Sequence, residues 1–304
     1  MALGGNPIFN GKSFRGATQA PPVPQAPYGA PYGQQSYGQS PYGQPSYGQA
    51  PYGQPGWGTQ PQNMTDEQLR QMYAQPSAGP ADTGRMTFDD VIMKTAACLG
   101  AVLVGAAITL TVGLPLASLL MIVGALGGFV LALVNTFKKQ PSPALILAYA
   151  ALEGLFLGGL TRILDTQYPG VGLQAVVGTL SVFAVTLLLF KSGKVRATPK
   201  AMRFFMIALG GYALFSIVNL VMMLTGVTNE PFGLRSGMLG VVIGLLAIGL
   251  AAFSLIMDFT SIEEGVRSGA PQRFSWTAAF GLTVTLVWLY VEIIRLLAIL
   301  RGDD

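Results

Sequence analysis

From about residue 91 to residue 300 the chain alternates long apolar blocks with short polar breaks. The blocks cover residues 91–112, 116–137, 144–164, 171–190, 202–225, 236–260 and 276–300. Each is near the roughly twenty residues that a helix needs to cross about 30 Å of hydrocarbon. Proline interrupts helices, and it stands between neighbouring blocks, for example at Pro115, Pro141 and Pro199. The pattern predicts an all-α membrane protein with seven transmembrane helices.

Several blocks also carry glycines four residues apart, on one face of the expected helix. These pairs are Gly124 and Gly128, Gly154 and Gly158, and Gly240 and Gly244. Small residues let helix backbones approach closely where lipid provides no hydrophobic drive for packing. We therefore interpret them as packing residues.

Residues 1–84 follow a different pattern. Tyr followed by Gly recurs with a period of five, at Tyr32, Tyr37, Tyr42, Tyr47 and Tyr52. Pro and Gln fill the intervals, so the segment cannot bury enough apolar surface to offset the entropy lost on ordering. It is compatible with a passive tail or with weak multivalent aromatic contacts. We predict a disordered low-complexity tail at 1–84 and a seven-helix transmembrane domain at 85–304.

Composition also indicates a membrane protein, because 51% of the residues are hydrophobic and only 11% are charged. Soluble domains contain about 25% charged residues. The single cysteine, Cys98, forms no internal disulfide and is expected to be a small apolar residue of the first helix. Histidine is absent, which excludes HExxH metalloproteases, Ser-His dyads and histidine switches. Proton-linked chemistry must therefore use carboxylates.

The basic residues are concentrated in a few loops. Five lie between the fourth and fifth blocks: Lys191, Lys194, Arg196, Lys200 and Arg203. Topogenic charges are expected in such a position, and binding of anionic lipid is the alternative. Nucleic acid is not an expected partner, despite the net charge of +4.

Loop charge also predicts orientation. With the tail inside, the inner loops hold nine basic residues, namely Lys138, Lys139, the five-residue cluster, Arg267 and Arg273. The outer side holds three: Arg162, Arg235 and Arg301. The positive-inside rule then predicts a multi-pass protein of the cell (plasma) membrane, with a cytoplasmic N-terminus and an outer C-terminus.

Ionisable groups within the apolar blocks are costly and are usually functional. They are Glu153, Asp258, Glu292 and Arg295. Two structural alternatives stay open. Glu292 can pair with Arg295, because residues three apart share a helix face. Asp258 can be a helix-end charge that reaches the cytoplasmic interface.

The functional alternative pairs Asp258 with Glu292 across the sixth and seventh helices. Two carboxylates about 4 Å apart at an effective dielectric near 20 repel by about 4 kcal/mol. One would then hold a proton near neutral pH, and losing it would separate the helices or admit a cation. A turn near residue 272 leaves an offset of roughly 9 Å between the two acids at helical rise. Irregularity or tilt would have to absorb this offset.

Calcium suits two carboxylates, but it prefers six to eight oxygen ligands. We therefore expect Asp258 and Glu292 to form a weak, transient calcium site, unless Glu153 and backbone carbonyls contribute. No cofactor is expected beyond calcium as a permeant ion.

The segments that carry these acids resemble a known family. Residues 254–262 (SLIMDFTSI) and 288–297 (WLYVEIIRLL) resemble the last two helices of the Bax inhibitor-1/YccA family. Residues 148–158 (AYAALEGLFLG) are similar to its third helix. The resemblance covers about residues 86–301, in order, and excludes the tail.

This resemblance implies a seven-helix fold in which six helices surround the last, and a pH-sensitive calcium leak channel. It places the paired, pH-sensing gate acids at Asp258 and Glu292, although the second acid is commonly Asp in that family. Glu153 and Arg295 are expected in the ion path or as partners of the gate acids. For the basic residue that holds the gate closed in some members, only Lys138 and Lys139 are weak candidates.

Other seven-helix or intramembrane functions fit poorly. A retinal protein needs a lysine in its last helix, and no lysine follows Lys200. An intramembrane aspartyl protease needs a Gly-x-Gly-Asp motif, which does not occur. We therefore expect no enzyme. Two functions remain: a channel that meets protons, calcium ions and membrane lipid, or a non-conducting scaffold or regulator of a membrane protease or other membrane-protein partner.

Overall fold

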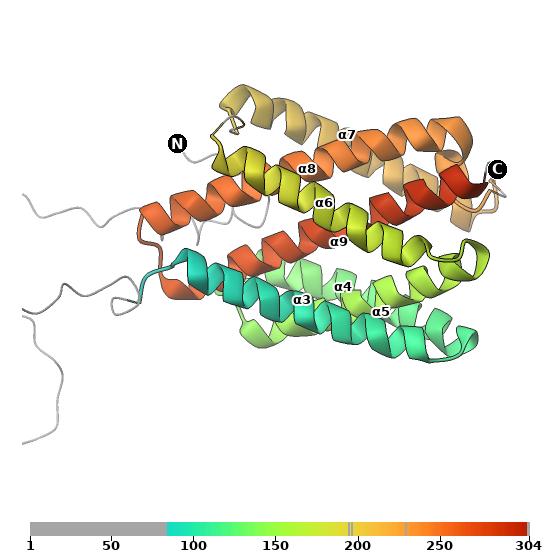
Figure 1. The fold of residues 1–304 in the computed structure, drawn as a ribbon, viewed down its shortest axis with the longest axis horizontal. Helices are drawn as coiled ribbons and strands as arrows, with labels where there is room; N and C mark the ends of the chain where they lie inside the picture. Colours follow the sequence, from blue (N-terminus) through green and yellow to red (C-terminus); the bar gives the residue numbers. More distant parts are fainter. Residues whose placement is uncertain (1–83, 194, 196, 229, 303–304) are drawn as a thin grey trace, which may run out of the picture. The chain divides into compact units, whose positions relative to one another are not determined.

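The computed structural model describes residues 84–193, 195, 197–228 and 230–302 (Figure 1). Predictions about residues 1–83, including the Tyr-Gly repeat, and about Lys194 and Arg196 lie outside this range. All regular elements of the described residues are helical. They are α3 (Phe88–Thr111), α4 (Leu114–Phe137), α5 (Pro143–Gln167), α6 (Val171–Lys191), α7 (Pro199–Leu224), η1 (Gly233–Arg235), α8 (Gly237–Arg267), η2 (Gln272–Phe274) and α9 (Ser275–Gly302).

Seven of these helices are long and apolar enough to cross a membrane, which confirms the predicted multi-pass fold. Six of them begin and end within three residues of the predicted blocks. The exception is α8, which was expected to end at residue 260 and continues to Arg267. Its last turns are polar in sequence, but Ile262 and Gly265 in them are buried. The helix ends at Arg267, and Gly269, just after the C-cap Ser268, has the positive φ of 68° that is typical of a glycine following a helix.

The first helix also differs slightly from expectation. The block was expected to start at residue 91, but α3 begins at Phe88. Thr87 is its N-cap, and the Thr87 hydroxyl accepts a hydrogen bond from the Asp90 amide at 3.1 Å. Asp89 and Asp90 in the first turn interact favourably with the helix N-terminus.

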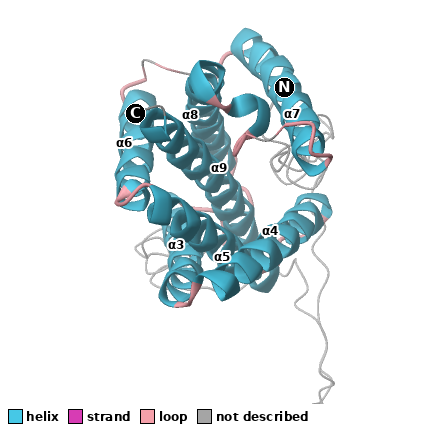
Figure 2. Cartoon of the chain, turned by 90° about the vertical axis from the view of Figure 1, so that its right-hand side faces the viewer, coloured by secondary structure: helices cyan, strands magenta, loops and turns pink. Residues whose placement is uncertain are grey.

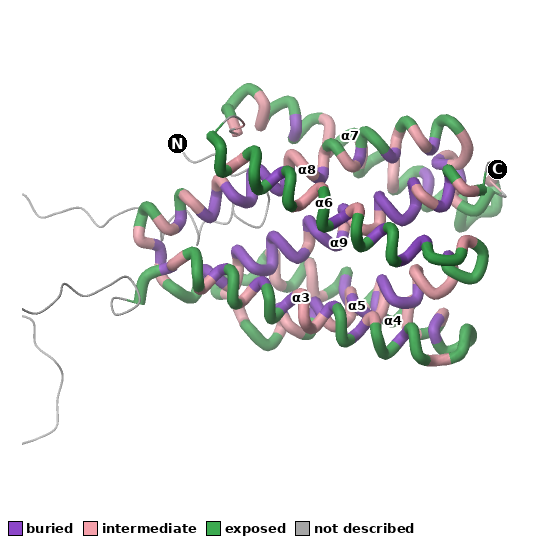
Figure 3. The backbone as a smooth tube through the Cα atoms, in the orientation of Figure 1, coloured by how far each residue is buried: buried purple, intermediate pink, exposed green. Residues whose placement is uncertain are grey.

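The last helix, α9, lies at the centre of the bundle (Figure 2). It packs against α3, α5, α6 and α8, while α4 packs mainly on α5. Buried residues continue along α9, whereas α4, α6 and α7 expose long apolar stretches (Figure 3). These exposed apolar surfaces are the ones that lipid would cover. The arrangement agrees with the expectation of six helices around the last.

Glycines bring the helices of one side of the bundle into close contact. A Cβ atom on Gly124 of α4 would lie 2.5 Å from the Leu152 carbonyl oxygen of α5. On the other side of α5, a Cβ on Gly158 would lie 2.6 Å from the Ala106 carbonyl oxygen. Any larger residue would push the helices apart, which confirms that these glycines are packing residues.

Candidate functional site

Asp258 lies deep inside the bundle rather than at its edge. The extension of α8 to Arg267 places Asp258 nine residues before the helix end, and its exposed fraction is 0%. The Thr285 hydroxyl of α9 donates a hydrogen bond to Asp258 Oδ2 at 2.7 Å. The interpretation of Asp258 as a charge that reaches the interface is therefore wrong, because its helix is longer than expected.

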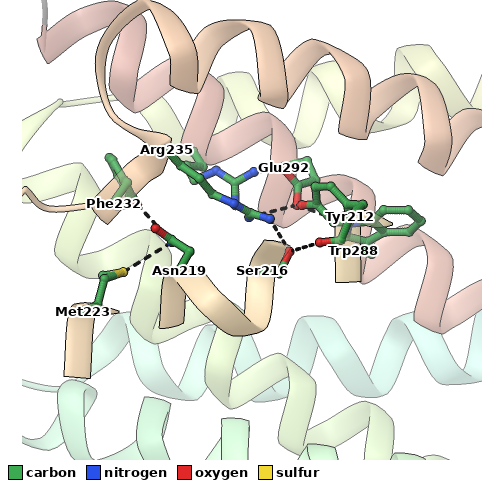
Figure 4. A network of polar contacts seen from close by, with 9 residues as sticks. Tyr212, Ser216, Asn219, Met223, Phe232, Arg235, Trp288 and Glu292 are labelled. Atoms are coloured by element: carbon green, nitrogen blue, oxygen red, sulfur yellow. Dashed lines mark hydrogen bonds and ion pairs between the residues drawn. The ribbon is translucent and has the colours of Figure 1, made fainter. Parts of the chain in front are cut away.

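Glu292 lies on α9 and is also buried. Its Oε2 accepts a hydrogen bond from Arg295 Nη2, which confirms the ion pair within the helix. That pair is only part of the arrangement, since Arg235 Nη1 lies 3.7 Å from Glu292 Oε1. The Tyr212 hydroxyl and Trp288 Nε1 also donate to Oε1, the latter at 3.2 Å (Figure 4). We call Glu292 and these four partners the Glu292 cluster.

Arg235 is the charged member of the Glu292 cluster that the sequence did not indicate. It was expected as an outer-loop charge, but it is only 7% exposed and points into the bundle from η1 (Figure 4). Its Nη2 donates to the Ser216 hydroxyl, and its guanidinium lies 4.7 Å from the Tyr212 ring centre. An arginine over an aromatic ring gains a cation–π attraction. Arg235 is therefore not the exposed loop charge that the sequence analysis assigned to the outer side.

Asn219 of α7 positions Arg235 by binding the backbone just before it. Its Nδ2 donates to the Phe232 carbonyl at 3.2 Å, and its Oδ1 accepts from the Leu234 amide at 2.6 Å (Figure 4). Between them, Gly233 has a φ of +60°, and a Cβ there would lie 2.5 Å from Asn219 Oδ1. Glycine is required at this position by both conformation and space. The amide of Asn219 thus fixes η1 onto α7.

Asp258 of α8 and Glu292 of α9, the two acids expected to form the gate, lie at different levels along α9. Asp258 is bound by Thr285, which precedes Glu292 by seven residues, a rise of about 10 Å along a helix. This is close to the offset expected from the turn between the helices, so neither tilt nor irregularity removes it. A direct contact between Asp258 and Glu292 stays a prediction. The partners described here for Glu292 are arginine, tyrosine and tryptophan side chains.

The other candidate residues lie in different surroundings. Glu153 of α5 lies near Tyr149, one helical turn earlier, and a Cβ on Gly128 of α4 would lie 2.8 Å from Glu153 Oε1. Its described contacts therefore belong to α4 and α5. Lys138 and Lys139 are exposed at the end of α4. The basic partners of Glu292 are instead the two arginines of the Glu292 cluster.

The arrangement has two chemical capacities. The Asp258 carboxylate and the Thr285 hydroxyl present oxygen atoms, the ligand type that calcium prefers, though fewer than it takes in a high-affinity site. The Glu292 carboxylate is the negative charge between two guanidinium groups. If Glu292 takes up a proton, these two cations lose the charge that holds them together.

Comparison with known families gives one match. A family model described as Bax inhibitor 1 like matches residues 6–302. The resemblance drawn from motifs was limited to residues 86–301, and the family match extends beyond it into the N-terminal region. No curated protein matches the chain.

Proposed function

The chain belongs to the Bax inhibitor 1 like family, and from this premise we propose that it is a pH-sensitive cation leak channel of the cell membrane. Calcium is the permeant ion of this proposal. The observation that carries it is the Glu292 cluster, which joins α7, η1 and α9 inside the bundle through charged groups. Buried charges of this kind are costly in a membrane and usually functional.

The Glu292 cluster acts as the gate. With Glu292 ionised, its carboxylate holds Arg235 of η1 and Arg295 of α9 together. In this proposal, that state is the closed one. Protonation removes this negative charge and leaves two neighbouring cations, which repel each other. Separation of η1 and α7 from α9 then opens the path. Acidification therefore opens the gate, the reverse of the direction expected for two carboxylates that share one proton.

Asp258 acts as the transit site for the cation. Its carboxylate lies about two helical turns from Glu292 along α9, at the level of Thr285. One carboxylate and a hydroxyl bind calcium weakly, which suits an ion that must leave as well as enter. The proposed orientation keeps the N-terminus in the cytoplasm and the C-terminus outside. The proposal assigns no catalytic step and no cofactor.

The decisive test measures calcium flux from liposomes that contain the purified full chain and a calcium dye. Wild-type protein should leak little at neutral pH and more as the pH falls. Glu292→Gln should leak at neutral pH and lose most of the pH dependence, since glutamine carries no charge. A change of about 1.4 kcal/mol in the gate equilibrium corresponds to a roughly tenfold rise in open channels. Asp258→Asn should lower the flux at every pH.

A matched control is Glu264→Gln, which changes an exposed acid of the same helix that carries Asp258. It should behave as wild type. If Glu292→Gln keeps the full pH dependence, the gate assignment is wrong. If wild-type protein shows no flux at any pH while a membrane protein co-purifies with it, the non-conducting scaffold or regulator is the better function.

A further inference from the structure

The segment just before α3 is attached to the loop that joins α8 to α9. The Met86 amide donates to the Ala270 carbonyl at 2.7 Å, and the Gln272 amide donates to the Gly84 carbonyl at 2.8 Å. Between these two hydrogen bonds, Arg85 and Pro271 form an antiparallel bridge. Both segments lie at the same end of the bundle, on the left of Figure 1. We call residues 84–86 the strap.

A buried side chain anchors the strap. Met86 is 1% exposed and belongs to the same core cluster as Ile262, Ala270 and Phe274. These residues come from the last turns of α8, from the loop and from η2. The strap therefore packs against both sides of the α8–α9 connection.

The first turns of α3 add polar contacts to the same loop. Gln272 Nε2 donates to Asp90 Oδ1 at 3.0 Å, and Lys94 Nζ donates to the Gln272 carbonyl at 3.3 Å. Lys94 also lies 5.8 Å from the ring centre of Trp276, at the start of α9. The strap and α3 thus hold the loop through its backbone, its side chains and the helix that follows it.

We propose that the strap keeps the α8–α9 hairpin in the closed arrangement and releases it when the channel opens. This inference rests on the proposed function, because α8 and α9 carry Asp258 and Glu292. Their direct connection at this end of the bundle is the loop that the strap binds. While the strap is bound, it holds α9 against α3 and so opposes the separation of α9 from η1 and α7 that opens the gate.

A reversible cross-link tests the strap. Arg85→Cys and Pro271→Cys are combined in a Cys98→Ala background, which removes the single native cysteine. Facing residues without mutual hydrogen bonds in an antiparallel bridge have Cα atoms about 4.5 Å apart, within the range of a disulfide. In the oxidised double variant, the rise in calcium flux at acidic pH should be roughly tenfold smaller than in the reduced one. A reductant should restore the full rise.

Arg85→Cys alone, in the same background, is the matched control, because it cannot form the disulfide and should give the same flux under oxidising and reducing conditions. If the oxidised double variant gates as the reduced one does, release of the strap is not needed and the inference is wrong.

A second measurement separates the strap from the channel itself. Hydrogen exchange of the amides in residues 268–274 is compared between wild type and Glu292→Gln. Faster exchange in the variant is expected, because opening frees the loop from the strap. If wild type shows no flux, the proposed function fails, and the exchange result then tests by itself whether the strap responds to the charge of Glu292. Equal exchange rates in both proteins would show that it does not, and the inference would be wrong.

Discussion

Helices α7 and α9 are almost equally apolar, yet they occupy opposite environments. In the most apolar stretch of α9 72% of the residues are buried, against 6% in α7. At Gly210 and Gly211, in the middle of α7, no atom of the described residues lies within 4 Å of a Cβ position once the neighbouring residues and the helix's own backbone are set aside. The enclosed helix is held by packing on all sides, whereas the peripheral one is attached at a few points. In a membrane, apolar character alone does not separate these cases, because lipid is as apolar as a protein core.

The attachments of α7 are specific contacts. Phe205 packs against Phe253 with ring centres 5.2 Å apart. Tyr212, Ser216 and Asn219 then reach the Glu292 cluster and η1, as Figure 4 shows. A helix held by polar contacts at one part of its length can be released by a change of charge there. This difference in attachment is why we assign gating to the interface of α7 and η1 with α9.

The largest expected effect comes from removing the charge at which the two helices meet. Glu292→Ala leaves Arg235 and Arg295 buried without their shared carboxylate. The free energy of unfolding should fall by about 3–5 kcal/mol, the cost of breaking a buried ion pair. Thermal unfolding in detergent measures it, with Glu264→Ala on the exposed face of α8 as control. Equal stability of both variants would mean that the ion pairs of Glu292 do not stabilise the fold.

The next effect contrasts one leucine from each helix. Leu289 of α9 is 0% exposed, while Leu214 of α7 is 64% exposed. Leu289→Ala should lower the free energy of unfolding by about 3 kcal/mol, because it opens a cavity among packed helices. Leu214→Ala should change it by less than about 0.5 kcal/mol, since lipid fills the space. Similar losses for both would show that α7 packs as closely as α9.

A smaller effect is expected where α7 holds η1. Asn219→Leu leaves the Leu234 amide and the Phe232 carbonyl without the partners seen here, at a cost of about 1–3 kcal/mol. It should also raise the leak at neutral pH, because Arg235 is no longer positioned. The control is Leu220→Ala, the exposed neighbour on the same helix. A variant that is less stable but keeps normal gating would limit Asn219 to a structural role.

The smallest effect is expected within the enclosed region. Thr285→Val keeps the shape of the side chain but removes the hydroxyl that binds Asp258. A loss of about 1 kcal/mol is expected, typical of one hydrogen bond. Thr285→Ser retains the hydroxyl and should retain both stability and calcium flux. If Thr285→Val and Thr285→Ser have the same stability and the same calcium flux, the hydrogen bond to Asp258 contributes to neither property.

The site was partly predictable. Acidic residues inside apolar blocks stand out because lipid penalises them, so Asp258 and Glu292 were found, and the three-residue spacing identified Arg295. Arg235 was misassigned because it adjoins a proline- and glycine-containing break, where an arginine has the pattern of a loop charge. A signal was nevertheless present on α7. Tyr212, Ser216 and Asn219 recur at intervals of four and three, a polar stripe on one face of an apolar helix.

The number of spans, their approximate ends and the all-helical class follow from the sequence by itself. In hydrocarbon every backbone polar group must be bonded within the segment, and the bilayer thickness sets the segment length, so apolar runs suffice to predict them. Which helix is enclosed, and which cation faces Glu292, depends on the tertiary structure. Lateral packing in lipid is decided by close fits such as Gly124 on α5 and by contacts from segments far apart in sequence. No local pattern records those neighbours, because they exist only once the helices have assembled.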